Sequence, residues 1–255
     1  MNAQSPIGVF DSGMGGLTVL DEIHQLMPGE DLIFIGDSKH NPYGTKSKEE
    51  VTERSIAICD WLVEKGVKSI VIACNTATSA CVPLLRKRYD IDIIGMEPAL
   101  KPACEKGEHQ RIAVWATQLT LQEKKFARLM ARYQDEHTIT KVPCPKLVEI
   151  VEEDRLDQMD QIHTILQDYI RQSGPVDSIV LGCTHFVYYK DSLVKELSDR
   201  VSLIDGNEGT ARHLKDILME KNLLNERGGA IQWMNSDPSK IELSKRLYQR
   251  LENKL

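Results

Sequence analysis

The chain has 255 residues, of which 41% are hydrophobic and 27% are charged. This length can bury a large core in one big or two small domains, and the composition is ordinary for a soluble globular protein. A formal charge of -6 with no basic run argues against a nucleic-acid partner, and the apolar stretches are too short to span a membrane.

Short apolar runs alternate along the chain with longer amphipathic stretches. The runs are rich in Ile and Val and lack polar alternation, which is typical of strands covered on both faces. The predicted strands are Ile7–Phe10, Leu32–Ile35, Ser69–Ala73, Asp92–Gly95, Ile112–Trp115, Thr138–Val142, Ser178–Gly182 and Val201–Asp205. The stretches Leu17–Met27, Lys48–Lys65, Gln122–Tyr133 and Asp157–Gln172 predict helices. This alternation predicts α/β architecture with parallel-sheet βαβ units.

The order of the strands indicates an internal repeat. Equivalent strands begin at 7 and 112, 32 and 138, 69 and 178, and 92 and 201, a nearly constant offset. We therefore predict two similar lobes related by duplication, with the active site in the cleft between them. The expected lobes are residues 1–97 with 209–255, and residues 98–208. The tail 209–255 is expected to be helical and to pack on the first lobe, with crossovers at Glu97-Pro98 and Gly206–Gly209.

The first predicted strand leads into a glycine-rich turn, Asp11-Ser12-Gly13-Met14-Gly15-Gly16. Such a turn exposes backbone N–H groups before a helix and suits a carboxylate or phosphate, although a purely structural tight turn fits equally well. It matches neither the dinucleotide fingerprint nor the P-loop, so a nucleotide is not expected. Asp11 either contacts a substrate or a nearby base, or caps the following helix.

Two of the six cysteines end apolar strands at equivalent positions of the repeat. Cys74 follows Ser69–Ala73 and Cys183 follows Ser178–Gly182. Ligands bind at the carboxyl ends of such strands, and a helix that begins there favours a thiolate. His185 could exchange protons with Cys183. Two thiols on opposite faces of one small molecule would suit stereochemical inversion.

The remaining cysteines, Cys59, Cys81, Cys104 and Cys144, are expected to be small buried hydrophobic residues. No Cys-x-x-Cys pair is present, and no second pair of close ligands accompanies Cys183 and His185, so we expect no metal. The polar start of the chain shows no signal peptide, so we expect a cytoplasmic protein. The acidic runs at Glu49-Glu50 and Glu152–Asp154 are expected to be solvated helix faces.

Four segments together resemble the bacterial glutamate racemase family, within the wider aspartate/glutamate racemase group. They are Phe10-Asp11-Ser12-Gly13-x-Gly-Gly, Pro42-Tyr43-Gly44, Ala73-Cys74-Asn75-Thr76-Ala77 and Gly182-Cys183-Thr184-His185. The resemblance spans nearly the whole chain and favours glutamate over aspartate. It implies cofactor-independent interconversion of L- and D-glutamate by two-base proton transfer at the α-carbon. It also implies a homodimer that supplies D-glutamate for peptidoglycan.

The resemblance also implies roles for individual residues. Cys74 and Cys183 match the catalytic pair, with Cys74 serving the D form and Cys183 the L form. Asp11, His185 and Glu152 match assisting groups. The residues that match substrate contacts are Asp11, Ser12, Tyr43, Gly44, Asn75, Thr76, Thr184 and His185. Thr117 and Thr120 resemble a Thr-x-x-Thr turn of the second lobe.

The chain departs from the family pattern at Phe186-Val187, Gly206 and Trp115-Ala116, which we expect to border the cleft and the turns of the second lobe. Two alternatives stay open. One is an aspartate racemase or another cysteine-dependent enzyme acting on a small diacid. The other is a non-catalytic module that clamps an amino acid between its lobes, which would bind saturably without loss of optical activity.

Overall fold

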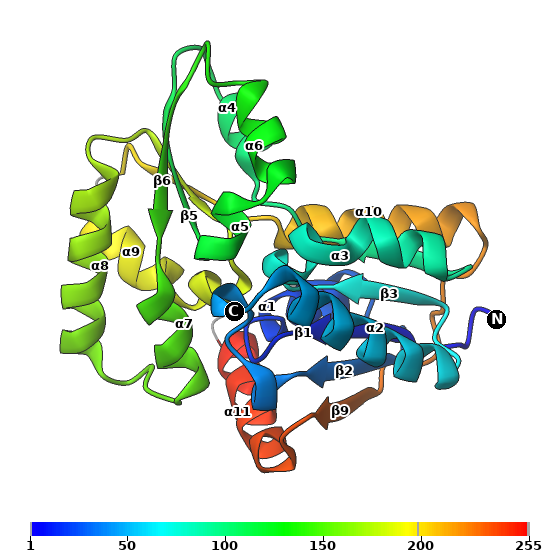
Figure 1. Cartoon of the computed structure of the whole chain (residues 1–255). Helices are drawn as coiled ribbons and strands as arrows, with labels where there is room; N and C mark the ends of the chain where they lie inside the picture. The colour runs from blue at the N-terminus through cyan, green and yellow to red at the C-terminus, as the bar shows by residue number, and fades with distance from the viewer. Residues whose placement is uncertain (1, 198, 254–255) are drawn as a thin grey trace.

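The computed structural model describes residues 2–197 and 199–253. Within these ranges the chain forms two sheets with helices on their faces, and the two sheets lie side by side in Figure 1. Every strand pair in both sheets is parallel. The predicted α/β architecture with two parallel sheets is therefore confirmed. Residues 1, 198 and 254–255, which belong to the predicted lobes, lie outside the described residues.

The first sheet has five strands in the order β4-β3-β1-β2-β9. Their bounds are β1 Ile7–Asp11, β2 Leu32–Gly36, β3 Ser69–Ile72, β4 Asp92–Gly95 and β9 Ile231–Asn235. Side chains alternate between two apolar layers along β1: Val9 faces the layer that contains α1, and Phe10 faces the layer that contains α2 and α3. Burial on both faces explains why these strands lack polar residues.

The second sheet has four strands in the order β6-β5-β7-β8. Their bounds are β5 Arg111–Ala116, β6 Thr138–Pro143, β7 Ser178–Leu181 and β8 Ser202–Ile204. With β5 matched to β1, β6 to β2, β7 to β3 and β8 to β4, the two sheets repeat one strand order. The cysteines that follow β3 and β7 therefore stand at equivalent places in two like sheets.

The tail of the chain differs from its prediction. Residues 209–255 were expected to be helical, but β9 lies within them and pairs in parallel with β2 as an edge strand. The strand was missed because it is only partly buried and carries Gln232 and Asn235, so it lacks the apolar run that marks the other strands. The helices of this tail, α10 and α11, both contact α1.

Helices connect the strands and cover both faces of each sheet. They are α1 Leu17–Leu26, α2 Lys48–Glu64, α3 Asn75–Arg88, α4 Leu100–Cys104, α5 Gln118–Gln122, α6 Lys124–Ala131, α7 Pro145–Glu152, α8 Met159–Ser173, α9 Lys190–Glu196, α10 Asn207–Glu220 and α11 Ile241–Glu252. Short 3₁₀ helices include η3 Thr184–Tyr189 and η4 Pro238–Lys240.

Two helix starts show how the sequence sets local structure near the strand ends. Ser47 and Glu50 form a capping box at the start of α2, which satisfies two backbone N–H groups. Cys74 is the N-cap of α3, and its sulfur accepts a hydrogen bond from Ala77 N. The chain therefore places a thiol where a side-chain oxygen usually stands.

No helix in the described part of the chain is both long and apolar enough to cross a membrane. The residue limits proposed for the lobes, 1–97 with 209–255 and 98–208, stay a prediction.

Candidate active site

A small cavity lies where the carboxyl ends of the strands of both sheets meet. Its volume is about 20 Å³, which is room for about one water molecule. The predicted site residues that line it are Ser12, Tyr43, Gly44, Cys74, Asn75, Thr76, Thr117, Cys183, Thr184 and His185. An adjoining cavity of about 400 Å³ shares Pro42, Gly44, Thr117 and Val148 with it. The small cavity in this structure has less volume than an amino acid needs.

Cys74 enters the cavity from the first lobe. Its sulfur lies 3.4 Å from Ala77 N at the start of α3 and 3.5 Å from Ser12 Oγ. Burial, with a contribution from the nearby carboxyl of Asp11, raises the pKa of Cys74 to about 12. In this arrangement Cys74 is a thiol near neutral pH and can donate a proton.

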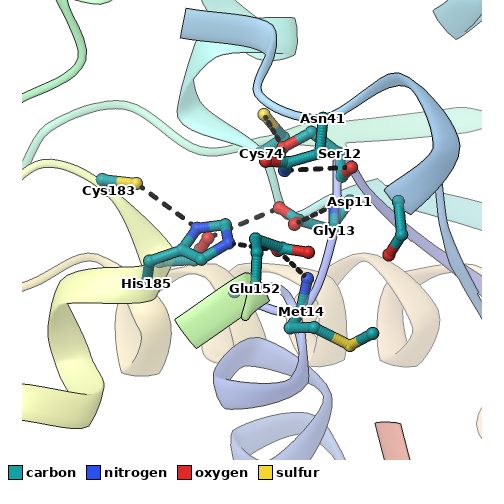
Figure 2. A network of polar contacts seen from close by, with 12 residues as sticks. Asp11, Ser12, Gly13, Met14, Asn41, Cys74, Glu152, Cys183 and His185 are labelled. Atoms are coloured by element: carbon teal, nitrogen blue, oxygen red, sulfur yellow. Dashed lines mark hydrogen bonds and ion pairs between the residues drawn. The ribbon is translucent and has the colours of Figure 1, made fainter. Parts of the chain in front are cut away.

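Cys183 enters the same cavity from the second lobe and contacts a histidine. Its sulfur lies 3.6 Å from His185 Nδ1, as Figure 2 shows. Burial alone lowers the pKa of His185, but its contacts with Cys183 and Glu152 outweigh burial and raise that pKa well above the ordinary value. A protonated His185 places a positive charge beside the Cys183 sulfur. The two thiols therefore occupy different electrostatic environments.

Glu152 joins the second lobe to the glycine-rich turn of the first. One carboxylate oxygen accepts hydrogen bonds from His185 Nε2 at 2.7 Å and from Met14 N at 2.6 Å. The expectation of a solvated helix face is wrong for this residue, whose side chain is only 13% exposed. It stands at the end of α7, where the fold turns it toward the first lobe rather than toward water.

Asp11 lies at the end of β1, behind the cavity rather than in its lining. It is fully buried; one oxygen accepts from Gly13 N at 2.8 Å and the other from Thr184 Oγ1 at 3.4 Å. Burial raises the pKa of Asp11, partly offset by the nearby His185. Its carboxyl fixes the turn after β1 and the hydroxyl beside Cys183.

The glycine-rich turn cradles anions that belong to the protein itself. Gly13 N contacts the Asp11 carboxylate and Met14 N contacts Glu152. A Cβ at Gly13 would lie 2.0 Å from Glu152 Oε1, and one at Gly15 would lie 2.3 Å from His185 Nδ1. A side chain at either position would displace Glu152 or His185 from the contacts they make here, because these side chains of the second lobe lie directly against the turn.

Threonine hydroxyls bridge the lobes beside the cavity. Thr76 Oγ1 in α3 lies 2.9 Å from Thr117 Oγ1, and Thr117 Oγ1 donates to Thr120 Oγ1 at 3.0 Å. Thr117 is also the N-cap of α5. The Thr-x-x-Thr turn of the second lobe therefore lies against the residues that follow Cys74.

The Asn75 side chain has an unused acceptor at the cavity. Asn75 is buried, and its carboxamide oxygen has no hydrogen-bond partner among the described residues. A buried acceptor without a partner is costly unless a ligand satisfies it. This oxygen is available to a donor such as an ammonium group.

Tyr43 is supported by residues that the sequence did not single out. Its hydroxyl donates to Asp37 Oδ2 at 2.6 Å, and Arg54 Nε and Nη2 each contact the same carboxylate at 3.0 Å. These bonds, chiefly the one from Arg54, outweigh burial and lower the pKa of Asp37. Asp37 comes directly after β2, at the same edge of the sheet as Asp11, and a carboxylate at a strand end was the available signal.

Two further residues, Asn41 and Val148, line the cavity without having been predicted, and Pro42 of the Pro42-Tyr43-Gly44 motif also lines it. Asn41 donates from Nδ2 to Ser12 O at 3.2 Å. Its place beside the Pro42-Tyr43-Gly44 turn was the only sequence signal. Gly44 permits the close approach of the second lobe, because a Cβ there would lie 2.7 Å from Thr117 Cβ.

Two departures from the family pattern do not border the cavity as expected. Phe186 is fully buried in the apolar core. Trp115 is also fully buried, and its indole N–H donates to Ser173 Oγ at 2.8 Å. Both rings therefore pack in the apolar core rather than in the cavity lining.

The other four cysteines are buried and free, as predicted. Cys59 and Cys81 lie in one apolar cluster of the first lobe, and Cys104 and Cys144 lie in clusters that contain residues of the second. Among the residues that the structure covers, no group of three or more His, Cys, Asp or Glu is arranged to hold a metal ion.

The Glu152–His185 pair gives the stability of the fold a defined pH dependence. A raised folded-state pKa means that the folded chain keeps a proton that the unfolded chain releases, so the stabilisation is lost as pH rises through that value. The difference in unfolding free energy between wild type and Glu152→Gln is expected to be largest near pH 6 and to shrink above about 6.5. Denaturant titrations over this range measure it, and a pH-independent difference would contradict the ion pair.

The chain matches a known family over most of its length. A sequence model of the Asp/Glu/Hydantoin racemase family matches residues 7–214. The glutamate racemase of Bifidobacterium animalis subsp. lactis is 50% identical over 258 aligned residues, which cover 98% of this chain and 100% of that protein.

Solved structures of glutamate racemases also resemble this chain along most of its length. Glutamate racemase isoform RacE1 from Bacillus anthracis superposes with a TM-score of 0.86 at 29% identity, over 97% of this chain and 95% of that one. The Escherichia coli glutamate racemase, solved in complex with L-glutamate and the activator UDP-MurNAc-Ala, has a TM-score of 0.77 at 33% identity. That match covers 84% of this chain and 83% of the other.

Proposed function

Because the chain belongs to the Asp/Glu/Hydantoin racemase family and is an amino-acid racemase, we propose that it interconverts L-glutamate and D-glutamate. One observation carries the proposal: two cysteines at equivalent strand ends of two like sheets line a single cavity. The relatives named glutamate racemase and the L-glutamate complex of the Escherichia coli protein support the choice of substrate.

The first step is removal of the α-proton of L-glutamate by the Cys183 thiolate. The C–H bond breaks, its electron pair stays on the α-carbon as a carbanion, and a new S–H bond forms on Cys183. Protonated His185, 3.6 Å from that sulfur, holds the thiolate before the step. Glu152 keeps His185 charged and oriented.

The second step delivers a proton to the opposite face of the carbanion. The Cys74 thiol gives up its proton, a new C–H bond forms, and D-glutamate results with Cys74 left as a thiolate. The raised pKa of Cys74 supports its role as the proton donor in this direction. The reverse reaction begins from the opposite protonation states. Both proton transfers use protein thiols, so the proposal requires no cofactor.

The carbanion needs more than a base, because an amino acid α-proton is far less acidic than a thiol. Hydroxyls of Ser12, Thr76 and Thr184 line the cavity and can bind the α-carboxylate as charge spreads onto it. The first N–H groups of α3 have no partner within the helix and add to this binding. The free Asn75 oxygen suits the ammonium group. Burial of the substrate between the lobes would exclude water, which strengthens each of these contacts.

The biological setting is a further part of the proposal. D-glutamate made by this enzyme would supply peptidoglycan synthesis in the bacterial cytoplasm, with the enzyme acting as a homodimer. The similarity to bacterial glutamate racemases along nearly the whole chain supports this setting.

Purified protein mixed with L-glutamate and no added cofactor is expected to bring the optical rotation of the solution to zero. A parallel incubation with L-aspartate is expected to keep its rotation. The measurement is polarimetry over time, with protein-free glutamate as the control. Stable rotation of glutamate would overturn the proposed function, and faster decay with aspartate would reassign the substrate.

A further inference from the structure

A lysine beside the C-terminal helix contacts the backbone of Glu152. Lys240 ends η4 and directly precedes α11, and its Nζ donates to Glu152 O at 2.8 Å. This contact joins the first lobe, to which β9 and α11 belong, to the end of α7 in the second. It is a polar contact between the lobes that lies outside the cavity.

The position of this contact allows Lys240 to influence the geometry of the active site. The last carbonyl groups of a helix lack partners within the helix, and a cation there also favours the negative end of the helix dipole. Lys240 satisfies the carbonyl of the same residue whose carboxylate holds His185 Nε2 and Met14 N. Fixing the main chain of Glu152 fixes the point from which that carboxylate reaches across the cleft.

Two neighbouring ion pairs from α11 bind residues near Glu152 but do not contact Glu152 itself. Arg246 pairs with Asp154 and Arg250 pairs with Asp157, just beyond Glu152. These pairs are largely exposed to solvent, and exposed pairs contribute little stability. Neither contacts Glu152. The bond from Lys240 to Glu152 can therefore be compared with the bonds from Arg246 and Arg250 to the loop that follows Glu152.

We propose that Lys240 is a positioning residue for the Cys183 half of the reaction, acting through Glu152 and His185. The inference rests on the proposed racemase function. It says that loss of the Lys240 bond lets Glu152 shift, so that His185 holds the Cys183 thiolate less well. Cys74, which has its own contacts with Ser12 and Ala77, is not affected.

Rates alone cannot show which thiol is impaired. The two enantiomers have equal free energy in solution, so any variant must change kcat/KM equally in both directions. Primary isotope effects with α-deuterated substrates do distinguish the two steps. When the Cys183 step becomes slower, the isotope effect on kcat/KM rises for L-glutamate, from which Cys183 removes the label. It falls for D-glutamate, from which Cys74 removes the label.

The test compares wild type, Lys240→Met and Lys240→Arg. Lys240→Met is expected to lower kcat about tenfold, the size of effect expected for one charge-assisted hydrogen bond. Its isotope effect is expected to rise for the L substrate and fall for the D substrate. Lys240→Arg, which keeps a donor, is expected to restore most of the rate. Arg246→Gln, from the helix α11 that Lys240 directly precedes, is the matched control and is expected to keep wild-type rate and isotope effects.

A double variant provides a second readout. If Lys240 acts through Glu152, then Lys240→Met added to Glu152→Gln is expected to cause little further loss. Should the methionine variant unfold, the isotope comparison is made with Lys240→Gln instead. Unchanged isotope effects, or a loss shared equally by Arg246→Gln, would overturn the inference while leaving the proposed function intact. Absence of racemisation in the wild type would instead refute the proposed function.

Discussion

Replacement of either cavity cysteine by serine is expected to lower the rate of glutamate racemisation by about 10²–10⁴-fold, the usual contribution of one positioned acid or base. A serine hydroxyl is far less acidic than a thiol, so it neither forms an anion at Cys183 nor releases a proton readily at Cys74. The substitution changes the acidity of the group far more than the shape of the side chain. Initial rates by polarimetry, with circular dichroism to verify folding, measure the effect.

Cys81 provides the matched control for this experiment. It lies in α3, the helix that Cys74 caps, and its sulfur donates to Ala77 O at 3.1 Å, a bond that a serine hydroxyl can also make. Cys81→Ser is expected to keep a rate close to wild type. Near-normal turnover in Cys74→Ser or in Cys183→Ser would remove the two-base mechanism.

Lys68→Met is expected to destabilise the fold by about 3–5 kcal/mol, the cost of leaving one buried charge without its partner. Lys68 Nζ lies 2.5 Å from Glu30 Oε2, and both side chains are completely buried. The same ammonium group donates to Ala3 O at 2.6 Å and to Leu223 O at 2.8 Å. The substitution therefore leaves the Glu30 carboxylate and two carbonyl groups without this hydrogen-bond donor. These groups lie at the end of the sheet opposite the cavity.

Urea unfolding monitored by circular dichroism measures this loss. The exposed pair Arg88–Asp60 is the control, and Arg88→Gln is expected to change stability by less than about 1 kcal/mol. Adding Glu30→Gln to Lys68→Met removes the unpaired buried charge of Glu30. The double variant is therefore expected to recover part of the lost unfolding free energy. A loss below about 1 kcal/mol for Lys68→Met would mean that the pair is not a buried one in solution.

The strands that could be predicted from the sequence are those buried on both faces. Runs such as Ser69–Ile72 carry only apolar side chains in their centres, because helices cover both sides. The edge strand β9 does not follow this pattern. It pairs with a strand on one side only, and polar residues are tolerated along it. Its place depends on β2, which lies about 200 residues earlier in the chain.

The two thiols at the cavity could be placed for a similar reason. Carboxyl ends of parallel strands meet at one edge of a sheet, so residues after β3 and β7 were expected to reach a common cleft. The contact of Glu152 with Met14 could not be predicted in this way. It depends on the relative orientation of two lobes, for which no local pattern in the sequence exists. The same holds for Lys240, whose bond to Glu152 spans 88 residues.

The origin of the new α-hydrogen tests the central claim most directly. L-glutamate is incubated with the enzyme in D₂O, and the α-position of both enantiomers is followed by proton NMR after chiral separation. Delivery from a second, solvent-exchanged thiol predicts that D-glutamate carries deuterium at the α-carbon from the earliest turnovers. D-glutamate that keeps its α-protium would show that one group removes and returns the same proton, and would contradict the account.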